Sequence, residues 1–246
     1  SLYLAALGRF LVGFGSSFAF VGVLKLATIW LPPSRFSLVS GLTVTLGMLG
    51  AVLADQVLVL IVQHSGWRHA LFQASIVGVI LVVLMALFIR DDSGEESADI
   101  KKNLASSFSQ VFQGIRVLLS KRDLWIVACI GLLMWVPLAI FAETNLGPDL
   151  IRYGYLPNID PESATRVSTY IISMFFIGWA VGAPIVNTLS DRIKSRKKPM
   201  MIGALSCFVI STAIIGGYIP SGLTSLCTAV FLFGFSCSVQ VIVFPI

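Results

Sequence analysis

Charged residues are scarce in this sequence, at 12% of its 246 residues. Soluble domains carry about 25% charged residues. Hydrophobic residues reach 57%, and the mean hydropathy is +0.92. These values exclude a chain made of one or two soluble domains, and they predict an integral membrane protein.

Histidine and cysteine are also rare, with two and four copies. All four cysteines lie in apolar stretches without paired spacing, which indicates reduced packing residues rather than disulfides. His64 and His69 have no cysteine or carboxylate close to them in the sequence. We therefore expect no metal site and no cofactor.

Long apolar runs fill the rest of the chain, and about 20 apolar residues suffice to cross a bilayer. Seven segments qualify: 3–31, 38–62, 69–89, 124–142, 165–188, 199–218 and 222–246. The loops on one side of them hold twelve Lys and Arg, and the loops on the other side hold three. The richer side is expected to face the cytoplasm. The net charge of +5 then reflects membrane topology rather than a nucleic-acid partner.

The connections carry signals of their own. The cytoplasmic connection 90–123 begins with acidic residues and continues with apolar residues at helical spacing, which predicts an amphipathic helix on the inner membrane surface. Asp160-Pro161-Glu162 predicts a helix start, with an N-cap, a first-turn proline and a favourable first-turn acid. Pro137 is expected to kink the segment 124–142, because proline lacks a backbone donor.

The stretch from Gly178 to Lys198 marks a membrane boundary. Its small residues Gly178, Gly182 and Ala183 predict a helix that packs closely on another helix. The same helix runs into the sequence Ser-Asp-Arg-Ile-Lys-Ser-Arg-Lys-Lys at 190–198, which belongs in water beside anionic head groups.

An apolar helix that ends in this way resembles the cytoplasmic loop signature of the major facilitator superfamily of transporters. Asn187 stands where that family often has glycine, and Lys194-Ser195 replaces its usual Gly-Arg. Further patterns of the family occur in the expected order, at 9–15 (Arg-Phe-Leu-Val-Gly-Phe-Gly), 30–36 (Trp-Leu-Pro-Pro-Ser-Arg-Phe) and 66–68 (Gly-Trp-Arg).

The resemblance implies an all-α membrane fold of two helix bundles, of which the seven segments would be helices 4 to 10 of twelve. Residues 1–89 would then be the second half of the N-terminal bundle, 90–123 the cytoplasmic linker, and 124–246 most of the C-terminal bundle. Residues 10–17 and 231–238 coincide at five of eight positions, six segments apart. Parallel repeats of six helices are how such transporters are built. We therefore expect the chain to be the central part of a longer protein.

Charged residues inside spans are costly, so they usually face a cavity or a partner. Asp55 follows Gly47 and Ala51 at four-residue spacing, on a face expected to pack against protein. We interpret it as a proton-coupling candidate, with a static partner for a basic side chain as the alternative. The resemblance associates Arg9 with proton coupling. The alternative is that Arg9 forms a structural link between helices.

Four more candidates lie near the ends or the interior of the spans. Glu143 is a candidate for a proton-coupling or gating role. The alternative is a solvated position at the rim of the helix bundle. Lys25 would attract an anionic substrate, or it would reach back to the membrane interface. Trp135 and Gln240 are candidate substrate contacts, with Trp179 and Asn187 as further interior candidates. For aromatic residues a lipid-facing position is the alternative.

The resemblance also implies that Asp191, Arg192 and Arg196 form a latch that stabilises the outward-facing state; the alternative is a cytoplasmic anchor. Together these features predict a secondary transporter, not an enzyme, in the bacterial inner membrane. It would take up a small organic anion or amino acid with protons by alternating access. Segment 38–62 lacks the Gly-x-x-x-Gly-Pro pattern of antiporters, which favours uptake. Efflux, facilitated diffusion, a non-transporting sensor and a seven-helix receptor remain the alternatives.

Overall fold

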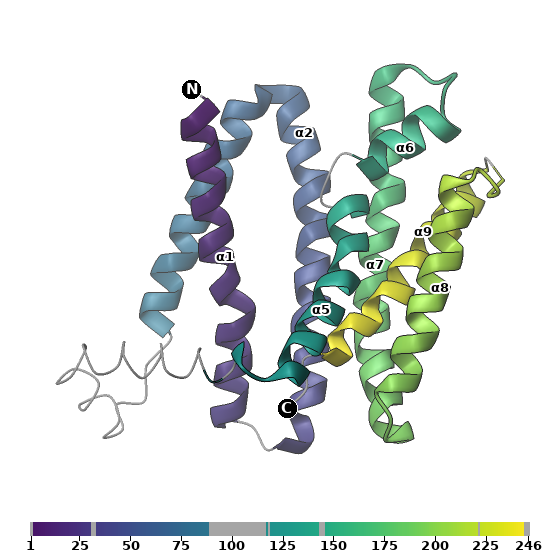
Figure 1. Cartoon of the computed structure of the whole chain (residues 1–246). Coiled ribbons are helices and arrows are strands. Elements are labelled where there is room, and N and C mark those ends of the chain that lie inside the picture. Colours follow the sequence, from purple (N-terminus) through teal and green to yellow (C-terminus); the bar gives the residue numbers. More distant parts are fainter. Residues whose placement is uncertain are drawn as a thin grey trace. The chain divides into compact units, whose positions relative to one another are not determined.

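The computed structural model describes residues 2–30, 33–88, 117, 119–142, 146–220 and 222–243. Nearly all of them are helical, which confirms the all-α prediction. The elements are α1 (Leu2–Trp30), α2 (Pro33–Phe88), α5 (Arg122–Pro137), η1 (Leu138–Ala142), α6 (Leu146–Tyr155), α7 (Pro161–Ile193), α8 (Lys197–Ile215), α9 (Leu223–Cys237) and η2 (Ser238–Val243). Figure 1 shows their course along the chain.

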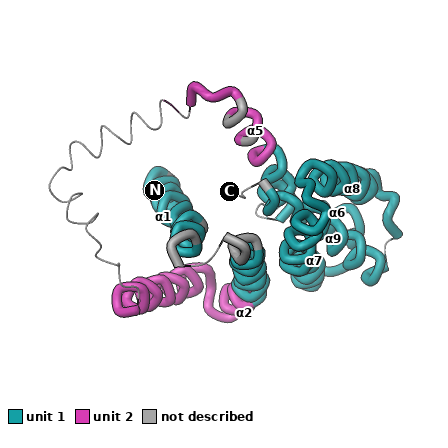
Figure 2. The backbone as a smooth tube through the Cα atoms, turned by 90° about the horizontal axis from the view of Figure 1, so that it is seen from below, with its two compact units in different colours: residues 1–56, 133–246 teal, residues 57–132 magenta. Residues whose placement is uncertain are grey.

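The chain divides into two compact units (Figure 2). The first unit contains residues 1–56 and 133–246, and the second contains residues 57–132. Helix α2 contributes to both units, because the division falls after Gln56. The predicted linker lies almost entirely outside the described residues, so its amphipathic helix and the predicted domain limits stay predictions.

Element α2 contains two of the predicted segments, as two helices that meet at a kink within the predicted connection 63–68. Only Gly66 departs from helical geometry, with φ 80° and ψ 162°, a conformation that glycine adopts without steric cost. The apolar part, Leu38–Phe88, has 51 residues. At 1.5 Å per residue it would measure about 77 Å, more than twice the thickness of a hydrocarbon core. The break at Gly66 therefore separates the two apolar segments, and no longer loop is needed between them.

By length and composition, five of the described helices are long and apolar enough to cross a membrane. The number rises to six if a bent pair of helices is counted as one span. That pair is Ala128–Ala142 and Leu146–Tyr155, which meet at 53°. The count is lower than the seven predicted segments because the two helices of α2, which meet at Gly66, are counted as one.

The bent pair shows what Pro137 does. The α-helix ends at Pro137 and continues as the π-helix η1, since proline removes a hydrogen-bond donor. Helix α6 then lies in the region that we predicted to be an outer loop, which corrects that prediction. The hydroxyl of Tyr155 at its end donates a hydrogen bond to the carbonyl of Ile214 in α8, at 2.6 Å.

The core of the first unit lies between α7 and α9, which run side by side with α8 (Figure 1). Its aromatic centre contains Phe175, Trp179, Phe141 and Phe233, and all four are buried. The rings of Phe141 and Phe233 meet edge to face, with centroids 5.1 Å apart. This cluster holds the helices that form the candidate site.

Small residues let α7 and α9 approach closely, as predicted. A Cβ atom built on Gly178 would collide with the backbone of Phe231 in α9. One built on Gly182 would collide with the side chain of Ser238, and one on Gly234 with the backbone of Phe175. The glycines on both helices are therefore required by contact rather than by backbone conformation.

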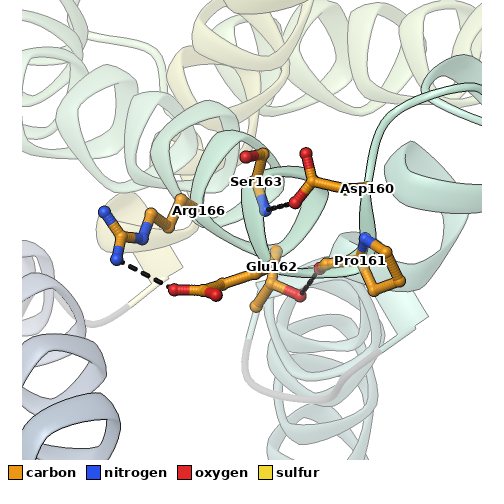
Figure 3. A network of polar contacts seen from close by, with 6 residues as sticks. Asp160, Pro161, Glu162, Ser163 and Arg166 are labelled. Carbon is orange, nitrogen blue, oxygen red and sulfur yellow. Dashed lines mark hydrogen bonds and ion pairs between the residues drawn. The ribbon is translucent and has the colours of Figure 1, made fainter.

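The start of α7 also follows the prediction (Figure 3). Asp160 is the N-cap, and its carboxylate accepts a hydrogen bond of 2.9 Å from the backbone N–H of Ser163. Pro161 occupies the first turn, and Glu162 pairs with Arg166 one turn later at 3.1 Å. The hydrogen bond from Ser163 lowers the pKa of Asp160, because it stabilises the ionised form.

Candidate functional site

A cavity of about 350 Å³ opens within the first unit. Its walls come from α1, α2, α5, α7 and η2, so residues far apart in the sequence meet there. They are Ala19, Val23, Thr43, Val44, Gly47, Met48, Trp135, Trp179, Gln240 and Val241. The exposed lining is almost wholly apolar, and a cavity of this size fits a small ligand.

Two indole rings form one wall of the cavity. The ring centroids of Trp135 in α5 and Trp179 in α7 lie 6.4 Å apart, at an interplanar angle of 66°. This edge-to-face geometry is a favourable arrangement for aromatic pairs. Trp179 is also held by Phe175 one turn earlier, at 5.8 Å between centroids. The wall is thus fixed by the aromatic core behind it.

Two residues that line the cavity each carry a buried polar atom with no hydrogen-bond partner within the described part of the chain: Nε1 of Trp179 and Oε1 of Gln240. Their residues are 1% and 2% exposed. Gln240 lies in η2, where the α-helix has tightened to a 3-10 helix. Buried polar atoms are almost always satisfied, so each exception requires an explanation.

The structure therefore brings together two of the predicted substrate contacts, Trp135 and Gln240, and joins Trp179 to them. Lys25 does not line this cavity; it is an exposed residue of α1. The roles of Trp135, Gln240 and Lys25 stay predictions. The sequence offered no signal for the cavity itself, since its walls come from five separate elements.

Two of the proton-coupling candidates, Arg9 and Asp55, do not line the cavity. Arg9 is exposed on α1, and Asp55 is partly buried on α2. No ion pair between these two side chains occurs among the described residues. On the predicted small-residue face of α2, Ala51 packs against the core and Gly47 lines the cavity. Glu143 lies outside the described residues, so its role stays a prediction.

Helices α2 and α7 meet along a seam within the first unit. The hydroxyl of Thr45 donates to the carbonyl of Ala180 at 2.8 Å. The amide of Gln56 donates to the hydroxyl of Ser173 at 2.9 Å. At Gly41, an added Cβ would lie 3.1 Å from Nδ2 of Asn187. Sequence reasoning missed these partners, because such pairings become visible only when helices are placed.

The predicted latch residues lie where α7 turns into α8. Asp191, Arg192 and Arg196 are exposed, and the carbonyl of Asp191 accepts a hydrogen bond of 3.2 Å from the N–H of Lys194. Lys194 has φ 52°, in the left-handed region that glycine favours. The resembling loop signature usually has glycine at this position, and the turn explains why. The latch itself stays a prediction.

A pair of thiols was also missed. Sγ of Cys207 in α8 and Sγ of Cys237 in α9 lie 3.5 Å apart, and both cysteines are free. They are 30 residues apart in the chain, so no local spacing pointed to the contact. The described residues contain no group of three or more metal-ligating side chains.

Comparisons with known proteins add to this geometry. The family model described as Major Facilitator Superfamily matches residues 1–246. A probable sulfoacetate transporter of Cupriavidus necator is 29% identical over 89 residues, which is 36% of this chain and 21% of that relative. The match thus spans about a fifth of the relative's length. No solved structure matches the chain.

Proposed function

Because the chain belongs to the Major Facilitator Superfamily, we propose that it forms part of a secondary transporter for a small organic anion or amino acid. The observation that carries this proposal is the cavity, whose walls come from α1 and α2 on one side of the sequence and α5, α7 and η2 on the other. In transporters built from repeated bundles, substrate sites lie between the bundles near the bilayer midplane.

Substrate would bind in this cavity while the bundles rock around it. An organic anion is favoured because the relative matched over 89 residues is described as a probable sulfoacetate transporter. Trp135, Trp179 and Gln240 would contact the substrate. Lys25, which lies outside the cavity wall, would attract an anion toward the site rather than bind it there.

Proton-coupled uptake is the mode that we propose. Asp55 is the first candidate for a carboxyl that gains and loses a proton between states, and Arg9 and Glu143 are the others. Asp191, Arg192 and Arg196 would act at the turn between α7 and α8, as a latch for one state. The basic residues of this turn would place it on the cytoplasmic face of a bacterial inner membrane.

Uptake by the full-length protein in proteoliposomes tests the proposal. Small organic anions and amino acids are offered with and without an inward proton gradient, to the wild type and to Asp55→Asn. Gradient-driven uptake that Asp55→Asn loses, with exchange retained, is the expected result. Driven uptake that the substitution leaves unchanged would remove Asp55 from the coupling role.

Two other results would favour the alternatives. Flux that ignores the gradient would indicate facilitated diffusion, and flux driven only outward would indicate efflux. Ligand binding without any flux would indicate a sensor on the transporter fold, and it would contradict the proposal.

A further inference from the structure

Helix α7 contains a proline in its interior, Pro184. Proline has no backbone N–H, so the carbonyl four residues earlier, that of Ala180, loses its usual partner within the helix. Ala180 is only 3% exposed, and a buried carbonyl without a hydrogen bond costs free energy. The interrupted turn of α7 therefore needs a donor from another element.

The hydroxyl of Thr45 in α2 is such a donor. Its oxygen lies 2.8 Å from the carbonyl oxygen of Ala180. Gly41, one turn earlier in α2, gives the two helices the space to meet, because a Cβ built there would lie 3.3 Å from Cα of Pro184. The contact thus joins α2 to α7 at the turn that the proline interrupts.

The same hydroxyl has a second acceptor. The carbonyl oxygen of Gly41, in its own helix, lies 3.1 Å from the hydroxyl oxygen of Thr45. If α2 moves away from α7, Thr45 keeps this hydrogen bond, and water that enters between the helices can donate to the carbonyl of Ala180. The contact can therefore open without leaving a polar group of either helix unsatisfied.

The contact adjoins the cavity on both helices. Val44 and Trp179, which precede Thr45 and Ala180 in the chain, line the cavity wall. Among the described residues, α7 packs closely along α9 but approaches α2 at few points. A movement that opens the cavity between α2 and α7 would therefore break the hydrogen bond of Thr45 and leave the core between α7 and α9 intact.

We propose that Thr45 is a positioning residue for transport, which stabilises the joined state of α2 and α7 by supplying the donor that Pro184 lacks. This inference rests on the proposed transport function and adds a contact that breaks and re-forms in each cycle. It leaves the proposed role of Asp55 unchanged, because the hydroxyl of Thr45 neither gains nor loses a proton.

The distance between spin labels on α2 and α7 measures the ratio of joined to separated molecules. Leu53 and Leu189 are exposed residues of the two helices, so Leu53→Cys and Leu189→Cys can carry the labels once the native cysteines are replaced. The full-length protein is reconstituted in lipid and measured without substrate. We expect a second population at longer distance beside the population that corresponds to the joined helices.

Three threonine substitutions test the donor. Thr45→Val keeps the shape and removes the hydroxyl, so it should lower the ratio of joined to separated molecules about fivefold or more, because the carbonyl of Ala180 is then buried without its donor. Thr45→Ser keeps a hydroxyl and should retain the ratio. Thr212→Val is the matched control and should also retain it, since the hydroxyl of Thr212 donates to the carbonyl of Phe208 in its own helix, α8.

Pro184→Ala tests the cause. Alanine restores a backbone N–H that can donate to the carbonyl of Ala180, so in this background Thr45→Val should change the ratio by less than about twofold. A shift as large as the one in the wild-type background would overturn the inference, because Thr45 would then act independently of the interrupted turn.

Two further results would overturn the inference. Thr45→Val that lowers the melting temperature but leaves the ratio unchanged would mean that the hydrogen bond is kept throughout the cycle. A single distance in every variant would mean that α2 and α7 do not separate. These results are distinguishable from failure of the transport proposal, because uptake in proteoliposomes is measured separately.

Discussion

Residues 10–17 of α1 and residues 231–238, at the end of α9 and the start of η2, have the same amino acid at five of eight positions, but their surroundings differ. All eight residues of the first copy are exposed. In the second copy Phe233, Gly234 and residues 236–238 are buried. A Cβ built on Gly13 meets no atom within 4 Å, whereas one on Gly234 collides with the backbone of Phe175.

The difference teaches that a glycine in an apolar helix marks a close contact only when a partner offers a matching surface. Helix α7 offers that surface to α9, since its Gly178 and Gly182 meet Phe231 and Ser238. Serines behave alike in both copies: Ser16 and Ser236 each donate to a carbonyl of their own helix. The open small-residue face of α1 is expected to receive another helix in the assembled protein.

The largest expected effect separates the two glycines directly. Gly234→Ala should lower the free energy of unfolding by roughly 1–3 kcal/mol, because its methyl group has no space beside Phe175. Gly13→Ala should change it by less than about 0.5 kcal/mol. Unfolding of the purified protein in detergent gives both values.

Equal losses for the two substitutions would break the comparison. They would mean that Gly13 is covered in the assembled protein as closely as Gly234 is. Gly22→Ala, at another open position of α1, then shows whether the covering extends along the helix.

A second test asks whether α7 also holds α2 by specific contacts. The hydrogen bond between Gln56 and Ser173 should give a coupling energy of about 0.6 kcal/mol, the average for such bonds between membrane helices. A double-mutant cycle with Gln56→Leu and Ser173→Ala measures it. Additive losses would mean that the two side chains do not stabilise each other.

The smallest expected effect concerns the N-terminus of α7, which Asp160 caps. Helix α1, by contrast, has no acidic residue in its first turn. The lowered pKa of Asp160 means that its stabilisation is present above the unfolded pKa and is lost as pH falls through the folded pKa. Asp160→Ala should therefore destabilise the protein slightly at neutral pH and less at acidic pH.

Thermal melts across acidic to neutral pH check this prediction. Asp160→Asn keeps a capping oxygen without a titrating group, so it should retain most of the stability at neutral pH and remove the pH-dependent part. A difference between wild type and Asp160→Ala that stays constant with pH would contradict the role of the ionised cap.

Local signals in the sequence predicted the local features of the fold. The cap at Asp160 and the helix end after Asp191 each depend on neighbouring residues, and Gly178 and Gly182 indicated a close contact without indicating its partner. The hydrogen bonds of Thr45 and Gln56, the thiol contact and the cavity depend on helices that meet far apart in the chain, and no local pattern encodes them. Helix α6 was missed because its ten residues are too short and too polar to resemble a span.

Predicted site residues divide in the same way. Trp135 and Gln240 were chosen as interior candidates, and the structure places them on one cavity. Lys25 was chosen for its charge, and charge alone does not indicate the face of the helix. The position along the helix determines which side chains reach the cavity. Ala19 and Val23, one turn apart, line it, and Lys25 lies on another face of α1.

The measurement that tests the central claim most directly compares two glycines of α2. Gly47 lines the cavity, and Gly50 does not; a Cβ on either meets no atom within 4 Å. Gly47→Leu should fold, fill the cavity and abolish uptake of the compound that the wild type transports in proteoliposomes. Gly50→Leu should melt and transport like the wild type. Wild-type uptake by Gly47→Leu would contradict the claim that substrate passes through this cavity.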